Sequence, residues 1–334
     1  MIKKLILSLS FVSILGLSTA IEAKTFKIAT IVPDGTTWMK KIRAGAKLIK
    51  KETNGRVKFK FYTGGVMGSS QSILKKMRIG QLHGGALTGG GLAAVYPDIQ
   101  IYSLPFLFHD YAEVDYVRKT MDPMLKAGLD ANGLKGLGLS EGGFAYFMSN
   151  TKIRSVDDLI RLKNWLPAGD QISQTVYEAA GISPVPLALS DVYTGLQTGL
   201  IDTVASNPTS VIAFQWHTKV KYVTDSPLIY LVGTFVMDKK AFDKIKPEDQ
   251  AIVTKVMDDV FKELDVINRK DNIAASDALK KQGIEFIKLT SDEKKRWQGI
   301  ADKSTLILKE KGLYTEKMYS TLTGLLQEYR KKNN

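Results

Sequence analysis

Short apolar stretches alternate with amphipathic stretches between residues 162 and 208. The pattern predicts strands at 162–166 and 200–205 and helices at 172–180 and 190–199. Alternating strands and helices favour parallel pairing with right-handed crossovers, and the loops after the carboxyl ends of such strands line the ligand crevice. We therefore expect the loops at 166–170 and 206–208 to converge on one site.

The same order of elements is predicted earlier in the chain. Phe26 to Val32 forms one apolar stretch, and residues 57–62 alternate between apolar and polar side chains, as in a half-buried strand. Helical spacing follows the first stretch, with Trp38, Ile42, Ala46 and Ile49 on one face. A second helix begins at Ser69 or Ser70 and ends at Gly80. Two similar α/β segments predict two lobes with a cleft between them.

The last third of the chain is predicted to contain one long helix. From Pro247 to Gln282 there is no further proline and no glycine, and apolar residues recur at helical spacing. A helix of about 30 residues is about 45–50 Å long, so it should run across both lobes. A break near Asp271–Asn272, giving two helices, is the alternative. Residues 227–237 are predicted to form a buried strand, and residues 101–108 a buried strand and turn.

Composition and the N-terminus indicate an exported globular protein. The chain has 334 residues, 44% of them hydrophobic, which suits two ordinary domains. Lys3 and Lys4 precede the apolar run 5–17, so we expect a cleaved signal peptide over residues 1–23, with an uncleaved anchor as the alternative. The absence of cysteine excludes a lipoprotein attachment site and disulfides, and fits a Gram-negative periplasm.

The formal net charge of +13 does not by itself predict a nucleic-acid partner. The lysines are spread along amphipathic helices, and no nucleic-acid-binding motif is present. A solvated basic surface explains the charge, and export argues further against nucleic acid.

Enzyme motifs are weak in this chain. Residues 138–142 match G-x-S-x-G, but the aromatic residues that follow predict a strand instead of the helix that this motif requires. The three histidines, His83, His109 and His217, are scattered and show no metal-ligand spacing. Gly89–Gly91 lacks the Lys-Ser/Thr of a P-loop. We predict no enzymatic activity, no metal and no cofactor, with a secreted serine hydrolase using Ser140 as the alternative.

Four segments carry a family resemblance, and together they cover nearly the whole mature chain. They are Asn54–Val57, Leu104–Phe108, Ser155–Leu159 and, most specifically, Ser190–Asp202 (SDVYTGLQTGLID). The chain resembles the dicarboxylate-binding solute-binding proteins of tripartite ATP-independent periplasmic (TRAP) transporters. The resemblance implies two α/β lobes, a hinge and a long helix spanning both. It suggests residues 24–149 plus about 237–270 for lobe I, and 150–236 plus about 271–330 for lobe II.

The resemblance also implies the positions that contact the solute. In the family, an arginine in the strand at 162–167 pairs with the solute's carboxylate, and an arginine forms two parallel bonds to such a group. Here that position is Trp165. The other family positions fall on Ala145 (a second arginine in some relatives), Thr88 (an acid), Leu189 (an aromatic), Asn207 or Ser206 (an asparagine), and near Ile31.

Loss of both arginines predicts an uncharged or zwitterionic polar solute, because an unpaired buried carboxylate is costly. Trp165 offers a ring for stacking. Glu141, Asp34 and Asp170 are acids near the predicted loops and could accept hydrogen bonds from hydroxyl or ammonium groups. The rival is an organic acid held by Lys163, by backbone N–H groups at 89–91 or by a metal ion. A lysine at this position also occurs in arginine-bearing relatives, so we interpret Lys163 as structural by preference.

The resemblance further implies the partners of the protein. Family members bind a small solute, close over it and deliver it to the membrane permease of a TRAP transporter. The binding protein of an ATP-driven importer is the nearer alternative. Closure is expected to use hinges near Asn150–Thr151 and Val236–Met237.

Overall fold

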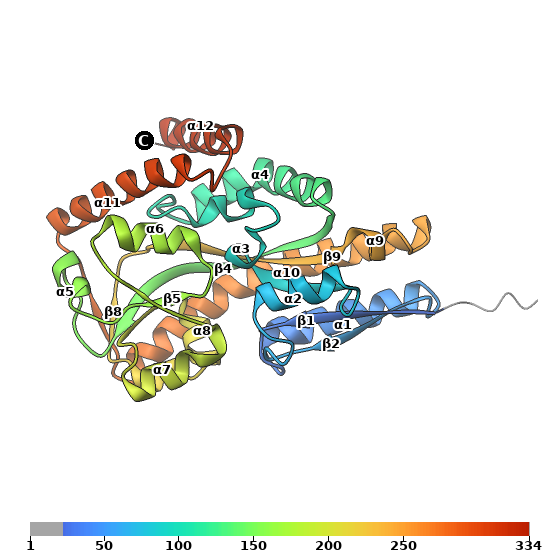
Figure 1. The fold of residues 1–334 in the computed structure, drawn as a ribbon, viewed down its shortest axis with the longest axis horizontal. Helices are drawn as coiled ribbons and strands as arrows, with labels where there is room; N and C mark the ends of the chain where they lie inside the picture. The colour runs from blue at the N-terminus through green and yellow to red at the C-terminus, as the bar shows by residue number, and fades with distance from the viewer. Residues whose placement is uncertain (1–22, 334) are drawn as a thin grey trace, which may run out of the picture.

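The computed structural model describes residues 23–333 and forms two α/β lobes that share two long strands (Figure 1). The main sheet has the strand order β10-β8-β4-β9-β3-β1-β2, and β7 pairs with the end of β4. Strands β4 (Leu134–Ser149) and β9 (Ile229–Asp238) run antiparallel through its centre. The predicted signal peptide lies outside the described residues apart from Ala23. No helix within residues 23–333 is long and apolar enough to cross a membrane.

Lobe I is built on the N-terminal strands and on the first halves of β4 and β9. β1 pairs in parallel with β2 and β3, and β3 pairs antiparallel with β9. The side chains of Thr36 and Ser69 cap the first two helices by accepting a bond from a backbone N–H. The elements of lobe I are β1 (Lys24–Thr30), α1 (Thr37–Glu52), β2 (Val57–Tyr62), α2 (Ser70–Arg78), β3 (Gly84–Thr88), α3 (Gly89–Leu92), η1 (Pro97–Ser103), α4 (Tyr111–Ala131) and α9 (Lys239–Phe242).

The prediction of a strand at 101–108 is wrong. The 3-10 helix η1 covers the first part of this stretch, beginning at Pro97, and Ile99, Ile101 and Tyr102 are buried in the core. A short apolar run satisfies a buried helix turn as well as a buried strand, so its pattern alone cannot distinguish them.

Lobe II contains short strands joined by short helices. β5 and β6 form a separate two-stranded parallel sheet, β8 and β10 are also parallel, and a parallel bridge joins Asn164 to Thr203. β7 pairs antiparallel with β4, so the expected parallel pairing holds for part of the lobe. The strands predicted at 162–166 and 200–205 are shifted along the chain by one to three residues. The elements of lobe II are α5 (Val156–Ile160), β5 (Trp165–Pro167), α6 (Gln171–Ala179), β6 (Val185–Leu187), η2 (Leu189–Asp191), α7 (Val192–Thr198), β7 (Thr203–Ser206), α8 (Pro208–Ala213), η3 (Trp216–Lys219), β8 (Tyr222–Thr224) and β10 (Glu285–Ile287).

Helix α10 (Pro247–Lys281) is a single helix of 35 residues that joins the lobes. It packs on α1 of lobe I, on β4 and on α8 of lobe II, so there is no break at Asp271–Asn272. Helix α11 (Ser291–Glu310) then leads to α12 (Glu316–Asn333).

The C-terminal helix lies on the opposite lobe from the one expected. Leu322 and Leu326 of α12 share a core with Leu125 and Leu129 of α4, which is part of lobe I (Figure 1). Helix α11 contacts α5 and α6, and α12 contacts α4, so we infer that the chain returns from lobe II to lobe I after α11.

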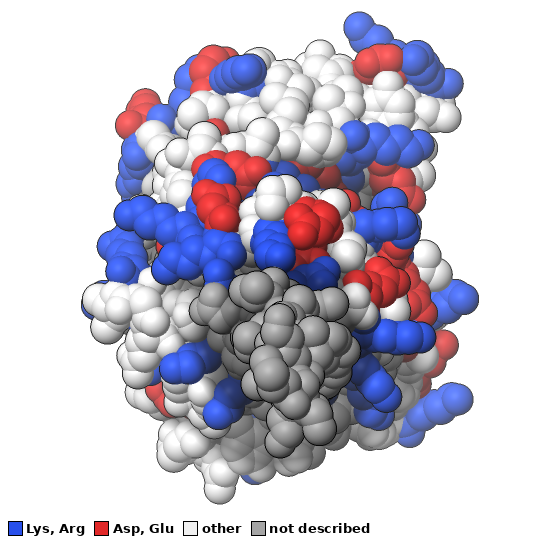
Figure 2. Space-filling model, turned by 90° about the vertical axis from the view of Figure 1, so that its right-hand side faces the viewer, with Lys and Arg blue, Asp and Glu red and all other residues white. Residues whose placement is uncertain are grey.

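The surface charge is mixed. On the face in Figure 2, Lys and Arg side chains cover much of the visible described surface and are interspersed with Asp and Glu. This distribution agrees with a solvated basic surface.

Candidate solute-binding site

A cavity of about 1000 Å³ lies between the two lobes. Lobe I contributes the loop after β1, the loop before α2 and the turn from β3 into α3. Lobe II contributes the β5–α6 loop, the residues around η2 and the turn from β7 into α8, and α10 closes the back with Asn268, Asp271 and Asn272. The two loops expected to converge, 166–170 and 206–208, therefore line one cavity.

The lobes touch at the mouth of this cavity. The Nε2 of Gln71, in α2, donates a hydrogen bond of 2.9 Å to the carbonyl oxygen of Ala168 in the β5–α6 loop. Nearby, Gly90 approaches Asp170 so closely that a Cβ on the glycine would lie 3.4 Å from the aspartate Cα. The structure is therefore a closed arrangement, held at the mouth by contacts between α2–α3 and the loop before α6.

Most of the residues predicted to contact the solute line this cavity. They are Ile31, Thr88, Glu141, Trp165, Asp170, Leu189, Ser206 and Asn207. Ala145 does not line the cavity: it is fully buried, and its carbonyl accepts a bond of 2.9 Å from Leu228 N–H. Ala145 pairs with Ile229 and shares its face of the sheet with Phe147, and both of these residues line the cavity. Burial beneath its neighbours therefore keeps the small Ala145 side chain from the wall. Asp34 also lies elsewhere, paired with Arg43 on the surface.

Trp165 forms part of the cavity wall but packs mainly as a core residue. Only 3% of its surface is exposed, and its Nε1 donates a bond of 3.1 Å to the carbonyl of Leu187. Its ring meets Trp216 edge-on, with the centroids 5.3 Å apart. The indole N–H is therefore already used, and only part of the ring face borders the cavity.

Asn207 is the N-cap of α8, and each end of its amide makes one hydrogen bond. The Oδ1 accepts a bond of 2.6 Å from Ser210 N–H, and the Nδ2 donates to the carbonyl of Gly142 at 2.5 Å. Asparagine suits an N-cap, and Pro208 suits the first helical position. The side chain thus ties lobe II to the middle of β4.

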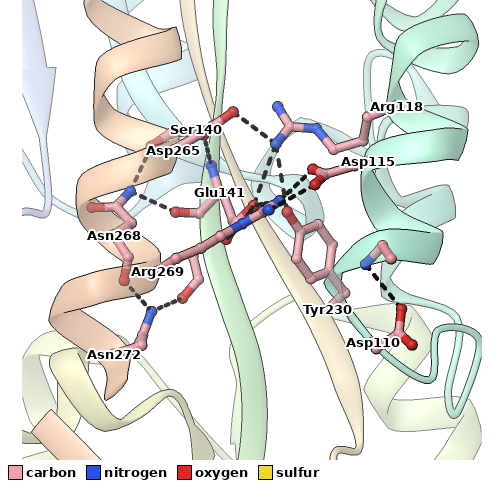
Figure 3. Close-up of polar contacts among 12 residues, drawn as sticks. Asp110, Asp115, Arg118, Ser140, Glu141, Tyr230, Asp265, Asn268, Arg269 and Asn272 are labelled. Carbon is pink, nitrogen blue, oxygen red and sulfur yellow. Dashed lines mark hydrogen bonds and ion pairs between the residues drawn. The ribbon is translucent and has the colours of Figure 1, made fainter. Parts of the chain in front are cut away.

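Glu141 is buried and neutralised by arginines (Figure 3). Arg269 of α10 binds both carboxylate oxygens, with contacts of 2.8 Å from Nε to Oε1 and 2.7 Å from Nη2 to Oε2. Arg269 also pairs with Asp115, and Arg118 of α4 lies 3.7 Å from Glu141 and 2.8 Å from Asp265. The Glu141 carboxylate is 0% exposed, so it serves this ion-pair network instead of offering an acceptor to a solute.

Asp170 is the N-cap of α6 and has no cationic partner within the described chain. Its Oδ1 accepts from Ser173 N–H at 3.1 Å and its Oδ2 from Ser173 Oγ at 2.6 Å. Burial raises the pKa of this carboxyl, and the bonds from Ser173 only partly oppose that rise.

Sequence reasoning missed Asp271, Gln71, Gln100 and Thr234, all of which line the cavity. Asp271 forms no salt bridge with any residue between 23 and 333. These residues lie on helices and strands whose sequence pattern indicates only the apolar face. No local pattern indicates which polar side chains reach the cleft.

The cavity wall contains acids and no cation. Among residues 23–333, the charged residues that line it are Glu141, Asp170 and Asp271, and no lysine, arginine or histidine does. Lys163, the suggested replacement for the family arginine, is not part of the lining, and its Nζ donates to the carbonyl of Gly199 at 2.7 Å. This position agrees with the structural role preferred for Lys163 and does not support the rival in which it holds a carboxylate.

Comparison with known proteins identifies the family. The model of "Bacterial extracellular solute-binding protein, family 7" (DctP) matches residues 28–309. This chain belongs to that family of solute-binding proteins. It is 26% identical over 283 residues to the C4-dicarboxylate-binding periplasmic protein DctP of Rhodobacter capsulatus, covering 84% of each chain. It is also 26% identical to the 2,3-diketo-L-gulonate-binding periplasmic protein YiaO of Escherichia coli, covering 72% of this chain and 74% of that one.

Solved structures confirm the predicted two-lobed fold of this solute-binding protein. A TRAP periplasmic solute-binding protein of Xanthobacter autotrophicus with bound β-D-galacturonate has a TM-score of 0.83 and 24% identity, covering 90% of this chain and 99% of that one. A TRAP protein of Haemophilus influenzae with bound L-gulonate has a TM-score of 0.84 and 22% identity, covering 90% and 100%. The predicted resemblance to the TRAP solute-binding proteins is confirmed.

The family is one of solute receptors. Within residues 23–333, the Ser140 hydroxyl is hydrogen-bonded to the side chains of Trp38 and Asn268. Ser140 lies within β4, where its Oγ accepts a bond of 3.0 Å from Trp38 Nε1. The motif at 138–142 therefore does not lead into a helix, as a nucleophile elbow requires. His217 lies in η3, with Nδ1 3.4 Å from the carbonyl of Val211.

Proposed function

We propose that this protein is the periplasmic receptor of a TRAP transporter for a polar solute that is uncharged or carries an ammonium group. A single observation supports this choice of solute. In the described chain, the charged residues that line the cavity are all acids, and no lysine, arginine or histidine lines it. A carboxylate enclosed there would have no positive partner, and an unpaired buried charge costs several kcal/mol. A zwitterion remains compatible only if its own positive group offsets its carboxylate.

The acidic side chains in the cavity wall can bind hydrogen-bond donors of a solute. Asp170 and Asp271 can accept bonds from hydroxyl, amide or ammonium groups, because an ionised carboxylate only accepts hydrogen bonds. The relatives named above bind C4-dicarboxylates or sugar acids, so this receptor would differ from them in the charge of its solute and not in its fold.

The test compares matched pairs of compounds on the mature protein. D-galactose and D-galacturonate differ only in a primary alcohol and a carboxylate, and succinamide and succinate differ only in amides and carboxylates. We expect the uncharged members to raise the melting temperature more, because a ligand that binds the folded state stabilises it. Micromolar binding of succinate or D-galacturonate in calorimetry would contradict the proposed solute class.

The transport assignment needs its own experiment. Uptake by vesicles that contain the receptor and the TRAP membrane subunits should stop when the ion gradient is dissipated and continue without ATP. Uptake that requires ATP would instead favour an ATP-driven importer. Exposure to a fluorophosphonate probe should leave Ser140 unlabelled, since we propose no hydrolase activity. A cleaved signal peptide over residues 1–23 should appear as a mature N-terminus near Lys24 in the periplasmic fraction.

A further inference from the structure

Two buried polar atoms at the lobe I end of the cavity have no hydrogen-bond partner in the described chain. They are the amide nitrogen Nε2 of Gln100 and the hydroxyl Oγ1 of Thr234. The two residues are 2% and 1% exposed, and both line the cavity. We propose that they form a polar subsite that receives an uncharged, oxygen-bearing group of the solute, a hydroxyl or an amide carbonyl.

The strand register places the Thr234 side chain on the face of the sheet that η1 covers. Thr234 of β9 lies opposite Leu87 of β3 on one side and opposite Leu139 of β4 on the other. Paired residues of antiparallel strands point to the same face of the sheet. Leu87 and Leu139 pack in the core that contains Ile99 of η1, so the Thr234 hydroxyl points toward η1 as well.

Gln100 reaches the same place from η1. A Cβ built on Gly89, immediately after β3, would lie 3.4 Å from Gln100 Cγ. Glycine at this position therefore allows η1 to lie close against the end of β3, only two residues beyond Leu87. The two unpaired groups consequently border one end of the cavity.

The chemistry of the two groups defines the bound group. The amide nitrogen of glutamine only donates, so the solute must present an acceptor, whereas the threonine hydroxyl donates or accepts. A buried polar group that lacks a partner destabilises the protein, and a hydroxyl or carbonyl oxygen would satisfy both atoms. A carboxylate would gain the same bonds but no positive charge, since no cation lines the cavity between residues 23 and 333.

This inference rests on the proposed function for the presence of a solute, but its test does not need the natural solute. Acetamide and acetate have nearly the same shape and differ in charge, so they probe the subsite directly. In crystals of the mature protein, we expect the acetamide oxygen within hydrogen-bond distance of Gln100 Nε2, and no acetate at that place under the same conditions. In solution, acetamide should shift the NMR signal of the Gln100 side-chain amide, identified by its loss in Gln100→Leu.

Variants separate recognition from folding. Gln100→Leu and Thr234→Val should each weaken acetamide binding by about five-fold or more, the loss expected for one hydrogen bond. Their melting temperatures without ligand should stay the same or rise, because each change removes an unpaired buried group. Ser103→Ala is the matched control: Ser103 lines the same end of the cavity, but its hydroxyl already donates to the Tyr230 carbonyl at 3.3 Å. It should leave acetamide binding unchanged.

Three results would overturn the subsite: ordered water that acetamide does not displace, acetate bound as well as acetamide, or acetamide binding that both variants retain. These outcomes differ from failure of the proposed function. Micromolar binding of succinate or D-galacturonate would refute the uncharged solute. Binding of uncharged compounds with unchanged affinity in Gln100→Leu would refute only the subsite.

Discussion

The ion-pair network around Glu141 and the wall of the solute cavity give their acids different partners. In the network, Arg269 holds Glu141 and Asp115 at 2.7 and 2.5 Å. Its hydrogen bonds lower the pKa of Asp115. In the cavity, Asp170 accepts bonds from Ser173 and from the backbone of Ile172, with no cation beside it in the described chain, and burial raises its pKa. Arg118 and Arg269 thus pair with acids of the protein itself, and no arginine of the described chain lines the cavity.

The difference shows that the position of a charge matters more than the number of charges. A chain with a formal net charge of +13 still has a cavity whose described wall includes no lysine, arginine or histidine. Net charge influences long-range attraction of ions, whereas binding in an enclosed cavity depends on the few groups in direct contact.

The largest expected effect comes from breaking the network. Arg269→Met leaves Glu141 buried with only Arg118, at 3.7 Å, as a cation. Removing one partner of a buried ion pair typically costs about 3–5 kcal/mol. Urea denaturation should show a loss of that size in the free energy of unfolding. Adding Glu141→Gln to this variant should restore part of it.

An exposed arginine provides the control for this variant. Arg296 pairs with Asp157 at 2.8 Å on the surface, where ion pairs contribute little. Arg296→Met should therefore be nearly neutral. Equal destabilisation by the two methionine variants would show that the network has no special role.

Next in size is the strained turn of β4 beside the network. Gly143 has a φ of +83°, and an added Cβ would lie 2.8 Å from Asn272 Nδ2 of α10. The strand register of β4 shifts between Glu141 and Gly143, and the carbonyl of Gly142 accepts bonds from lobe II and from α10. We therefore favour this turn as the hinge over Val236–Met237, which are fully buried in the lobe I sheet. Gly143→Ala should cost about 1–3 kcal/mol, as a forced left-handed residue does.

Gly133→Ala tests whether conformation alone explains that loss. Gly133 has nearly the same φ, +80°, but no atom lies within 4 Å of an added Cβ. Denaturation of both variants should show the smaller loss for Gly133→Ala. The role of the turn would be refuted if Gly143→Ala were the milder change and left solute-induced closure intact.

A smaller effect is expected at the mouth of the cavity. Gln71→Ala removes the bond to Ala168 that joins the lobes, a contribution of about 0.5–1.5 kcal/mol. Small-angle scattering of the variant without solute should give a larger radius of gyration, and a saturating solute should reduce it. Gln298→Ala, which removes only a surface bond to Asp302 on α11, should leave the scattering profile unchanged. Identical profiles for all three proteins would argue against closure by this contact.

The smallest expected effect is on the pH dependence of stability, because the pKa values of Asp170 and Asp115 are shifted in opposite directions. Because the folded-state pKa of Asp170 is raised above its ordinary value of 3.8, the native protein loses stability as pH rises through that raised pKa. Asp170→Asn keeps an N-cap and should remove this loss, so its advantage over the native protein should grow with pH.

Asp115 should behave in the opposite way. Its pKa is lowered by Arg269, so it stabilises the protein above pH 3.8, and this contribution disappears as pH falls through the lowered pKa. Asp115→Asn should therefore lose stability at neutral pH and converge with the native protein in acid. Parallel pH profiles for the two asparagine variants would refute the contrast between the network and the cavity.

Local patterns in the sequence determined the elements and their order. The helical spacing after Pro247, without a further proline or glycine, predicted the long helix that joins the lobes, and the structure extends it to 35 residues. The caps and the Gly-terminated helices set the alternation of strands and helices, since these signals act within a few residues. The resemblance placed all but one of the proposed solute positions along the cavity.

Only the tertiary structure decided the chemistry at those positions. Glu141 was expected at the solute and is instead bound by Arg269, 128 residues later in the chain. Ala145 is fully buried although its partner Ile229 lines the cavity, and Trp165 packs against Trp216. The physical reason is the same in each case. The environment of a side chain is set by groups that are distant in sequence, and pairing or burial by those groups determines whether it remains available to a solute.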